Sequence, residues 1–226
     1  MRDVIIACDF KDKETLYTFL NKFDTERPFL KIGMELFYKE GPNLVKELKA
    51  NGFKIFLDLK LHDIPTTVYK AMKNIASLNV EMTNVHASGG IKMMAHAKKA
   101  ITESNSQTTL IAVTQLTSTS DQTLLDELLI TTQMSDTIKH SAENTKKAGL
   151  KGVVCSPLEA PIMNELGLIS VTPGIRFSNN DNDDQVRVAT PTYAKELGSS
   201  YIVVGRSITQ ATNVRKAYLR ALKEFC

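Results

Sequence analysis

The sequence has few cysteines, and their arrangement excludes two kinds of small protein. Only Cys8, Cys155 and Cys226 are present, and none of them belongs to a CxxC pair. Disulfide frameworks and structural zinc sites are built from paired cysteines, so neither is expected here. Cys8 and Cys155 lie in apolar runs, which favours reduced, buried thiols over catalytic nucleophiles.

Long hydrophobic runs are also missing. Apolar runs such as residues 201–204 are far shorter than the roughly 18 residues expected of a membrane span. After Met1-Arg2-Asp3 the chain passes at once into the strand-length run 4–7, without the apolar core or cleavage site of a signal peptide. The sequence therefore predicts a cytoplasmic protein with no membrane partner.

Charge of either sign is not concentrated anywhere in the chain. The formal net charge is only +3, and the Lys and Arg residues are interspersed with Asp and Glu. This excludes the basic patch expected of a nucleic-acid-binding protein. A length of 226 residues, with 42% hydrophobic and 23% charged residues, fits one globular α/β domain over residues 1–226.

About eight short apolar runs alternate with longer amphipathic stretches, as in βα units laid end to end. The expected strands are Val4–Cys8, Phe29–Gly33, Lys54–Leu59, Met82–His86, Leu110–Gln115, Gly152–Cys155, Leu168–Val171 and Tyr201–Val204. The expected helices include Lys13–Lys22, Asn43–Ala50, Thr67–Leu78, Ile91–Ile101, Asp136–Ala148 and Asn213–Phe225, with a short helix beginning near Ser207. Most of the strands are continuously apolar, which is typical of parallel strands buried on both faces. The sequence therefore predicts a single-domain (β/α)8 TIM barrel.

The segment 58–67, Asp-Leu-Lys-Leu-His-Asp-Ile-Pro-Thr-Thr, is the most informative in the chain. Residues two apart in a strand share a face, so Asp58 and Lys60 should both point into the barrel mouth. Lys31, at the end of the preceding strand, should stand beside Asp58. Such alternating charges suit a developing carbanion, with Lys60 as the acid, although Asp-x-Lys alone favours a purely structural ion-pair network.

The full set of motifs resembles the orotidine 5′-phosphate decarboxylase family over the whole chain. Residues 58–67 match its Asp-x-Lys-x-x-Asp-Ile-Pro-x-Thr segment at every defined position. The other matches are Asp9, Lys31, Thr114–Thr117, Thr172–Arg176, Gln185 and Val204–Arg206. Many members have Gly where this chain has Asn182, which puts in doubt the tip geometry of the polar loop 178–184.

The resemblance implies a metal-independent decarboxylation of orotidine 5′-phosphate without a cofactor. Lys60 would protonate C6, Asp58 would face the departing carboxylate, Lys31 and Asp9 would hold ribose hydroxyls, and Thr117 would contact the pyrimidine. The phosphate would bind Arg206, the Gly205 amide, Gln185 and Arg176, with loop 178–184 as a lid, although a plain solvated connection is the alternative. The family also implies a homodimer with shared active sites. Asp63, Ile64 and Thr67 would contact substrate, and Asp63 and Thr67 would do so in the partner subunit's site. Asp63 would also be catalytic, with Lys31, Asp58 and Lys60, because it would complete their set of charges across the interface.

Two alternatives remain open. Magnesium-dependent sugar-phosphate enzymes, such as 3-keto-gulonate 6-phosphate decarboxylase and hexulose-phosphate synthase, share the Asp-x-Lys-x-x-Asp strand. They are expected to have a metal-binding carboxylate where this chain has Lys31, and that lysine would repel Mg²⁺. A non-catalytic nucleotide sensor should lack part of the charged set that the resemblance implies, and all of its members are present here, namely Asp9, Lys31, Asp58, Lys60 and Asp63. His62 and His86 are expected to play no catalytic part, and His96 and His140 are expected to be solvated or capping.

Overall fold

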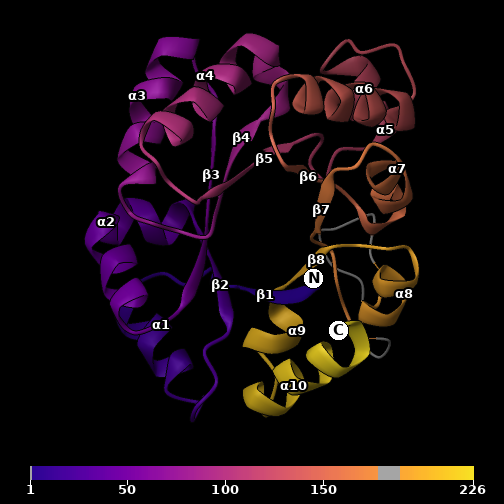
Figure 1. Cartoon of the computed structure of the whole chain (residues 1–226). Helices are drawn as coiled ribbons and strands as arrows, with labels where there is room; N and C mark the ends of the chain where they lie inside the picture. The colour runs from indigo at the N-terminus through magenta and orange to yellow at the C-terminus, as the bar shows by residue number, and fades with distance from the viewer. Residues whose placement is uncertain (1, 178–188) are drawn as a thin grey trace.

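A computed structural model describes residues 2–177 and 189–226 of the chain (Figure 1). Eight parallel strands pair in sequence order and close into a barrel, with β1 hydrogen-bonded to β8. The strands are β1 (Asp3–Ala7), β2 (Phe29–Gly33), β3 (Lys54–Leu61), β4 (Met82–His86), β5 (Thr109–Val113), β6 (Gly152–Val154), β7 (Ile169–Thr172) and β8 (Tyr201–Val204). The predicted (β/α)8 TIM barrel is confirmed, and the predicted bounds of β2, β4 and β8 are reproduced.

Helices follow the strands and surround the barrel (Figure 1). They are α1 (Lys13–Leu20), α2 (Met34–Ala50), α3 (Pro65–Ala76), α4 (Gly90–Glu103), α5 (Asp121–Asp126), α6 (Met134–Lys147), α7 (Ala160–Glu165), α8 (Pro191–Glu196), α9 (Arg206–Thr209) and α10 (Val214–Phe225), with 3-10 turns η1 (Ala87–Gly89) and η2 (Pro157–Glu159). The helix expected over Asn43–Ala50 is the second half of α2. Its first half, before a break at Gly41 with φ 71°, was not predicted.

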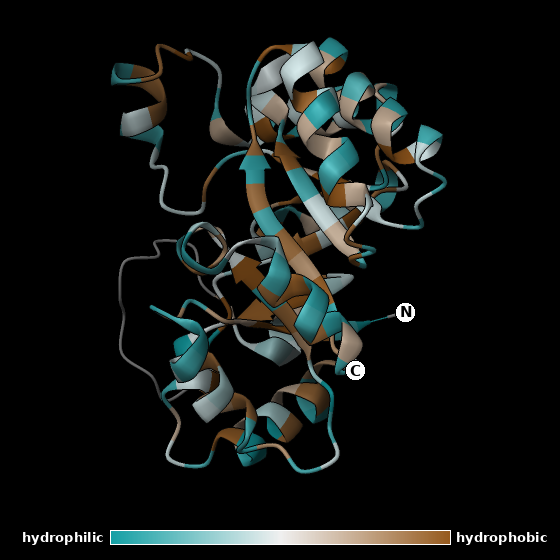
Figure 2. Cartoon of the chain, turned by 90° about the vertical axis from the view of Figure 1, so that its left-hand side faces the viewer, coloured by the Kyte–Doolittle hydropathy of each residue, from teal (hydrophilic) through white to brown (hydrophobic). Residues whose placement is uncertain are grey.

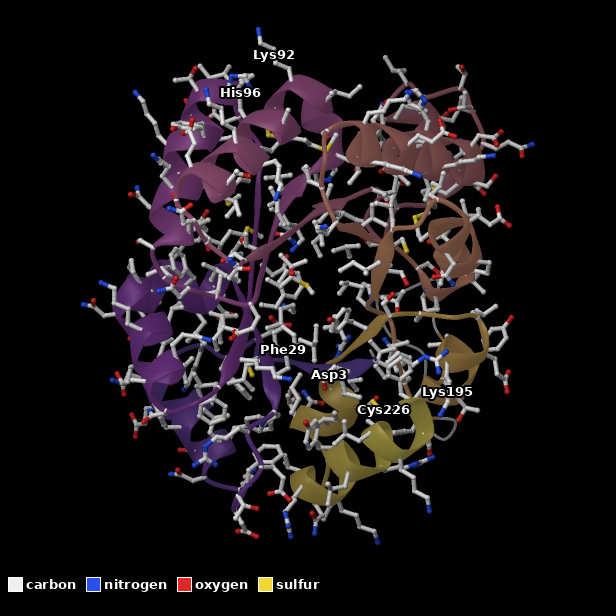
Figure 3. All side chains as sticks on the ribbon, in the orientation of Figure 1. Asp3, Phe29, Lys92, His96, Lys195 and Cys226 are labelled. Carbon is white, nitrogen blue, oxygen red and sulfur yellow. The ribbon has the colours of Figure 1, made fainter. Side chains whose placement is uncertain are left out.

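The core has two main layers, because both faces of every strand are covered. Apolar side chains from seven strands fill the barrel, among them Ile5, Phe29, Phe56 and Met82. A larger cluster lies between the outer face of the strands and the surrounding helices. Figure 2 shows this pattern as brown central strands with teal concentrated on the outer helices, and in Figure 3 Lys92 and His96 project outward from α4.

The arrangement brings the carboxyl ends of all eight strands to one end of the barrel, where active sites of this fold lie. The two termini lie close together in both cartoon views (Figures 1 and 2). Within the part of the chain that the structure describes, no helix combines the length and apolar character that crossing a membrane requires.

Candidate active site

A cavity of about 1350 Å³ opens at the carboxyl ends of the strands. Eight of the site residues expected from the sequence line it, namely Asp9, Lys31, Asp58, Lys60, Thr117, Arg176, Gly205 and Arg206. They lie within or just after strands β1, β2, β3, β5, β7 and β8, so residues far apart in the sequence meet in one space.

Four of these residues form a continuous line of alternating charges. Lys60 Nζ lies 2.7 Å from Asp58 Oδ1, and Lys31 Nζ lies 3.5 Å from Asp58 Oδ2 and 2.8 Å from Asp9 Oδ1. The side chains of Lys31 and Asp58 are only 13% and 10% exposed, whereas that of Asp9 is 62% exposed. The predicted contacts of Asp58 with Lys31 and Lys60 are therefore present. We refer to Asp9, Lys31, Asp58 and Lys60 as the charged array.

Mutual pairing keeps the buried members of the array ionised. Burial raises the pKa of Asp58, but the neighbouring Lys31 and Lys60 ammonium groups and the hydrogen bonds that the carboxylate accepts outweigh it, so the pKa lies below its ordinary value. Burial also lowers the pKa of Lys31, and the Asp58 and Asp9 carboxylates raise it above its ordinary value. At neutral pH both groups carry their charges, as a preorganised electrostatic site requires.

The backbone of Lys60 departs from regular strand geometry. Its φ is +50°, in the left-handed region that non-glycine residues rarely adopt. Lys60 and Asp58 do point into the same cavity, as predicted, but strand alternation alone does not describe the turn of the chain that presents the lysine.

Asn84 and Gly33 belong to the site although the sequence analysis did not select them. Asn84, fully buried in β4, donates from Nδ2 to Asp58 Oδ1 at 2.7 Å and accepts the Lys60 backbone N–H at 2.8 Å. A Cβ on Gly33 would lie 3.1 Å from Asp9 Oδ1 and 3.4 Å from Lys31 Nζ, so glycine allows this ion pair to approach the strand. In the sequence, Asn84 could have been noticed as a polar residue inside a buried strand, and Gly33 as a glycine at the end of a strand.

The histidines and buried cysteines lie outside the line of charge. The His62 and His86 rings stack 5.5 Å apart, and His86 Nδ1 is 2.6 Å from Ser88 Oγ. Burial, and then the charges of His62 and Lys60, lower the pKa of His86, which favours its neutral form. Burial raises the pKa of Cys8, so this thiol is not a poised nucleophile.

The other side of the cavity, after β7 and β8, carries two arginines. Gly205 precedes α9, and Arg206 is its first residue, close to the helix start expected near Ser207. The loop after β7 is joined at its base, because Arg176 N donates to Ala189 O and Ala189 N donates to Gly174 O, each at 3.0 Å. The predicted phosphate ligand Gln185 and the predicted lid 178–184 lie outside the described residues.

Asp63, Ile64 and Thr67 do not line the cavity of their own chain. All three are exposed, and Asp63 accepts the backbone N–H of Ile64 at 2.6 Å. The single chain therefore brings together the charged array and the arginines, and it leaves these three residues on the surface near the carboxyl end of β3.

Comparisons with known proteins identify relatives of this chain. Residues 2–221 match the model of the orotidine 5′-phosphate decarboxylase / HUMPS family. Proteins named orotidine 5′-phosphate decarboxylase from Bacillus cereus (strain Q1) and Bacillus mycoides (strain KBAB4) are each 52% identical over 224 residues, which cover 96% of this chain and 94% of each relative. The crystal structure of orotidine 5′-phosphate decarboxylase from Lactobacillus acidophilus is similar with a TM-score of 0.90 and 42% identity, covering 100% of this chain and 99% of that one.

Proposed function

Because this chain belongs to the orotidine 5′-phosphate decarboxylase / HUMPS family, we infer that it decarboxylates orotidine 5′-monophosphate to uridine 5′-monophosphate in pyrimidine biosynthesis. The observation that carries this inference is the Lys31, Asp58 and Lys60 array, with an ammonium on each side of a buried carboxylate. An array of this kind stabilises negative charge that develops on a carbon atom. Residues 1–226 would act as one catalytic domain, in the cytoplasm.

In the proposed reaction the bond between C6 and the carboxyl carbon breaks, and its electron pair stays on C6 as carbon dioxide leaves. Lys60 then transfers a proton from Nζ to C6 and regains one from solvent. Asp58 would face the substrate carboxylate, and this like-charge contact would be relieved as that group departs. Lys60 suits both steps because its ammonium opposes the carbanion charge before it donates the proton.

The rest of the substrate would lie across the cavity towards β7 and β8. Asp9 and Lys31 would hold ribose hydroxyls, and Thr117 would contact the pyrimidine ring. Arg206, the Gly205 amide and Arg176, together with Gln185, would bind the phosphate, since arginine offers forked donors and the backbone N–H groups at the start of a helix favour anions. Binding energy from this remote group can be used to orient the reacting ring.

The magnesium-dependent members of the wider family are the alternative, and Lys31 is the residue that argues against them. Its ammonium lies 2.8 Å from Asp9 and 3.5 Å from Asp58, so it already neutralises the carboxylates that would otherwise attract a cation. No group of three or more His, Cys, Asp or Glu side chains suited to a metal ion occurs among the described residues.

A homodimer with shared active sites is supported by an apolar rim on the barrel mouth. Four large apolar side chains that follow the neighbouring strands β2 to β5 are at least 41% exposed, namely Met34, Ile64, Ile91 and Leu116. Exposed apolar side chains after neighbouring strands are consistent with a protein partner at this end of the barrel. A second copy packed there would bring its own Asp63, Ile64 and Thr67 to the neighbouring mouth.

The test is a decarboxylase assay on metal-free protein. Purified protein treated with EDTA is mixed with orotidine 5′-monophosphate, and loss of the orotate absorbance and formation of uridine 5′-monophosphate are followed. We expect turnover to survive chelation and to be unchanged by added Mg²⁺, because the array supplies its own cations.

A Lys60→Ala preparation purified in the same way controls for a contaminating host enzyme. An absolute requirement for Mg²⁺, or activity confined to a sugar phosphate, would refute the proposed function.

A further inference from the structure

Strand β3 is irregular at the point where it presents the catalytic residues. Leu57 pairs with Thr83 and Leu61 pairs with Val85, so β3 contains two more residues than β4 between these pairs. Asp58, Leu59 and Lys60 occupy this bulge, and Lys60 takes its left-handed conformation within it. Bulges disrupt the ladder locally and occur next to active sites, where they redirect a side chain.

Asn84 is the residue of β4 that faces this bulge. Its Oδ1 accepts the Lys60 N–H, a donor that the regular ladder no longer pairs, and its Nδ2 donates to Asp58 Oδ1. The two bonds fix the amide orientation, because one needs the oxygen and the other needs the NH₂ group. Since Lys60 Nζ also donates to Asp58 Oδ1, Asn84 is joined to Lys60 through both its backbone and its partner carboxylate.

We propose that Asn84 is a positioning residue for the decarboxylation, which holds the Lys60 backbone in its left-handed conformation and holds Asp58 at the angle that pairs it with both lysines. The inference rests on the proposed function. A left-handed non-glycine residue is costly unless its surroundings enforce it. The hydrogen bond that Asn84 Oδ1 accepts from the Lys60 N–H restrains this conformation, and Asn84 is fully buried.

Thr83 provides a matched control one residue away. It is also fully buried in β4, and its Oγ1 donates to the Leu57 backbone oxygen at 2.9 Å. Thr83→Val therefore removes a buried hydrogen bond between the same two strands without touching the charged array. Any effect common to Asn84→Ala and Thr83→Val reports general loss of strand pairing.

The experiment compares steady-state decarboxylation by the wild type, Asn84→Ala and Thr83→Val. We expect Asn84→Ala to lower kcat at least about tenfold, since a misplaced catalytic group is costly, while KM, which depends on phosphate contacts far from Asn84, changes less than about threefold. Thr83→Val should keep kcat within about twofold of the wild type. A kcat for Asn84→Ala equal to that of Thr83→Val, or an effect confined to KM, would overturn the proposal.

Asn84→Asp gives a second readout that does not depend on the alanine variant folding. The new carboxyl keeps an acceptor for Lys60 N–H and, when protonated, a donor for Asp58. Asn84 contacts Asp58 and Lys60 directly. The other charged or titratable groups at this end of the barrel are Lys31 and Asp9, joined to Asp58 through ion pairs, and the stacked rings of His62, just beyond β3, and His86, at the end of β4.

In Asn84→Asp we expect kcat to acquire a new ionisation and to fall as the pH rises, because two adjacent carboxylates share a proton only at lower pH. A profile identical to that of the wild type would contradict the proposal. Wild-type protein without any decarboxylase activity would instead refute the proposed function, so the two failures are distinguishable.

Discussion

Lys31 and Lys60 differ in the carboxylates that they contact, and this difference fits separate parts in the proposed reaction. Both lysines line the cavity, but Lys31 lies between Asp9 and Asp58, whereas Lys60 pairs with Asp58. A lysine held between two carboxylates is suited to fixing geometry. A lysine with one such partner can turn an N–H towards the substrate.

Replacing Lys60 should therefore remove chemistry and spare binding. We expect Lys60→Ala to lower kcat at least about a hundredfold, as loss of a general acid does, with uridine 5′-monophosphate still bound in a calorimetric titration. Arg206→Ala should instead raise KM about 10- to 100-fold, the range expected when a charged hydrogen bond to phosphate is lost. Lys60→Ala with most of its activity intact would exclude Lys60 as the proton donor.

We expect kcat to stay constant across the neutral pH range, because Lys31, Asp58 and His86 do not change charge there. The pKa of Asp58 lies below its ordinary 3.8, so its charge is lost only in stronger acid, and the pKa of Lys31 lies above its ordinary 10.5. The lowered pKa of His86 keeps that ring neutral at pH 7. A pH profile from 5 to 9 checks this expectation.

In the same profile, kcat/KM should fall in acid near pH 6, because the substrate phosphate takes up its second proton at about that value. An ionisation of kcat itself between pH 6 and 8 would contradict the pKa directions assigned to Lys31, Asp58 and His86.

The ionisation of Asp58 also contributes to the stability of the fold. Because the folded-state pKa of Asp58 is depressed, its contribution to stability is complete above its unfolded pKa of about 3.9 and is lost as the pH falls through the folded value. Asp58 should therefore add to acid sensitivity only below about pH 4.

Most of the charged array could be predicted from the sequence, because charged side chains at the ends of apolar strands are conspicuous. Asn84 could not, since one amide within a buried five-residue strand is compatible with many structural roles. The bulge that gives it a role arises from the register of β3 against β4, and register between two strands is not visible in either strand alone.

At the level of elements, the strands were easier to predict than the helices. Continuous apolar runs define buried parallel strands well. By contrast, α5, α7 and α8 each have only six residues, too few to show a helical period. The first half of α2 was missed because Gly41 and Pro42 resemble a loop, whereas the helix resumes directly after a left-handed glycine.

The break in α2 offers a direct test of backbone strain away from the active site. A Cβ on Gly41 would meet no atom within 4 Å, so its positive φ of 71° is the main constraint. Gly41→Ala should lower the free energy of unfolding by about 1 to 3 kcal/mol, measured by urea denaturation at fixed protein concentration. Gly41→Asn should lose about as much, because at ψ −170° the conformation is essentially restricted to glycine and the tolerance of Asn for the left-handed helical region does not apply. An unchanged free energy of unfolding for Gly41→Ala, or a clearly smaller loss for Gly41→Asn, would argue against this strain as the cause.

At the scale of the whole molecule, the mouth of the barrel is divided into distinct regions. The charged array lies at the ends of β1 to β3, the arginines follow β7 and β8, and the exposed apolar side chains follow β2 to β5. Asp63 and Thr67 lie beyond β3 with this apolar rim and outside the cavity of their own chain. A partner packed on the rim would have both residues within its reach.

The shared-site homodimer predicts a recovery that a self-contained site cannot give. Lys60→Ala and Asp63→Ala homodimers should each be severely impaired. When they are mixed after dissociation, one site of each mixed dimer carries both lesions, and the other combines an intact Lys60 with an intact Asp63 from its partner.

With free reassortment about half the dimers are mixed, so activity should approach about a quarter of the wild-type value at equal protein. Lys60→Ala mixed with Lys60→Ala,Asp63→Ala is the matched control and should recover nothing, since no site in that mixture contains Lys60. If Asp63 served its own chain, every site in the first mixture would also carry a lesion. Absence of recovery, with subunit exchange verified by mass-tagged chains, would therefore refute the shared site and leave Asp63 to its own barrel.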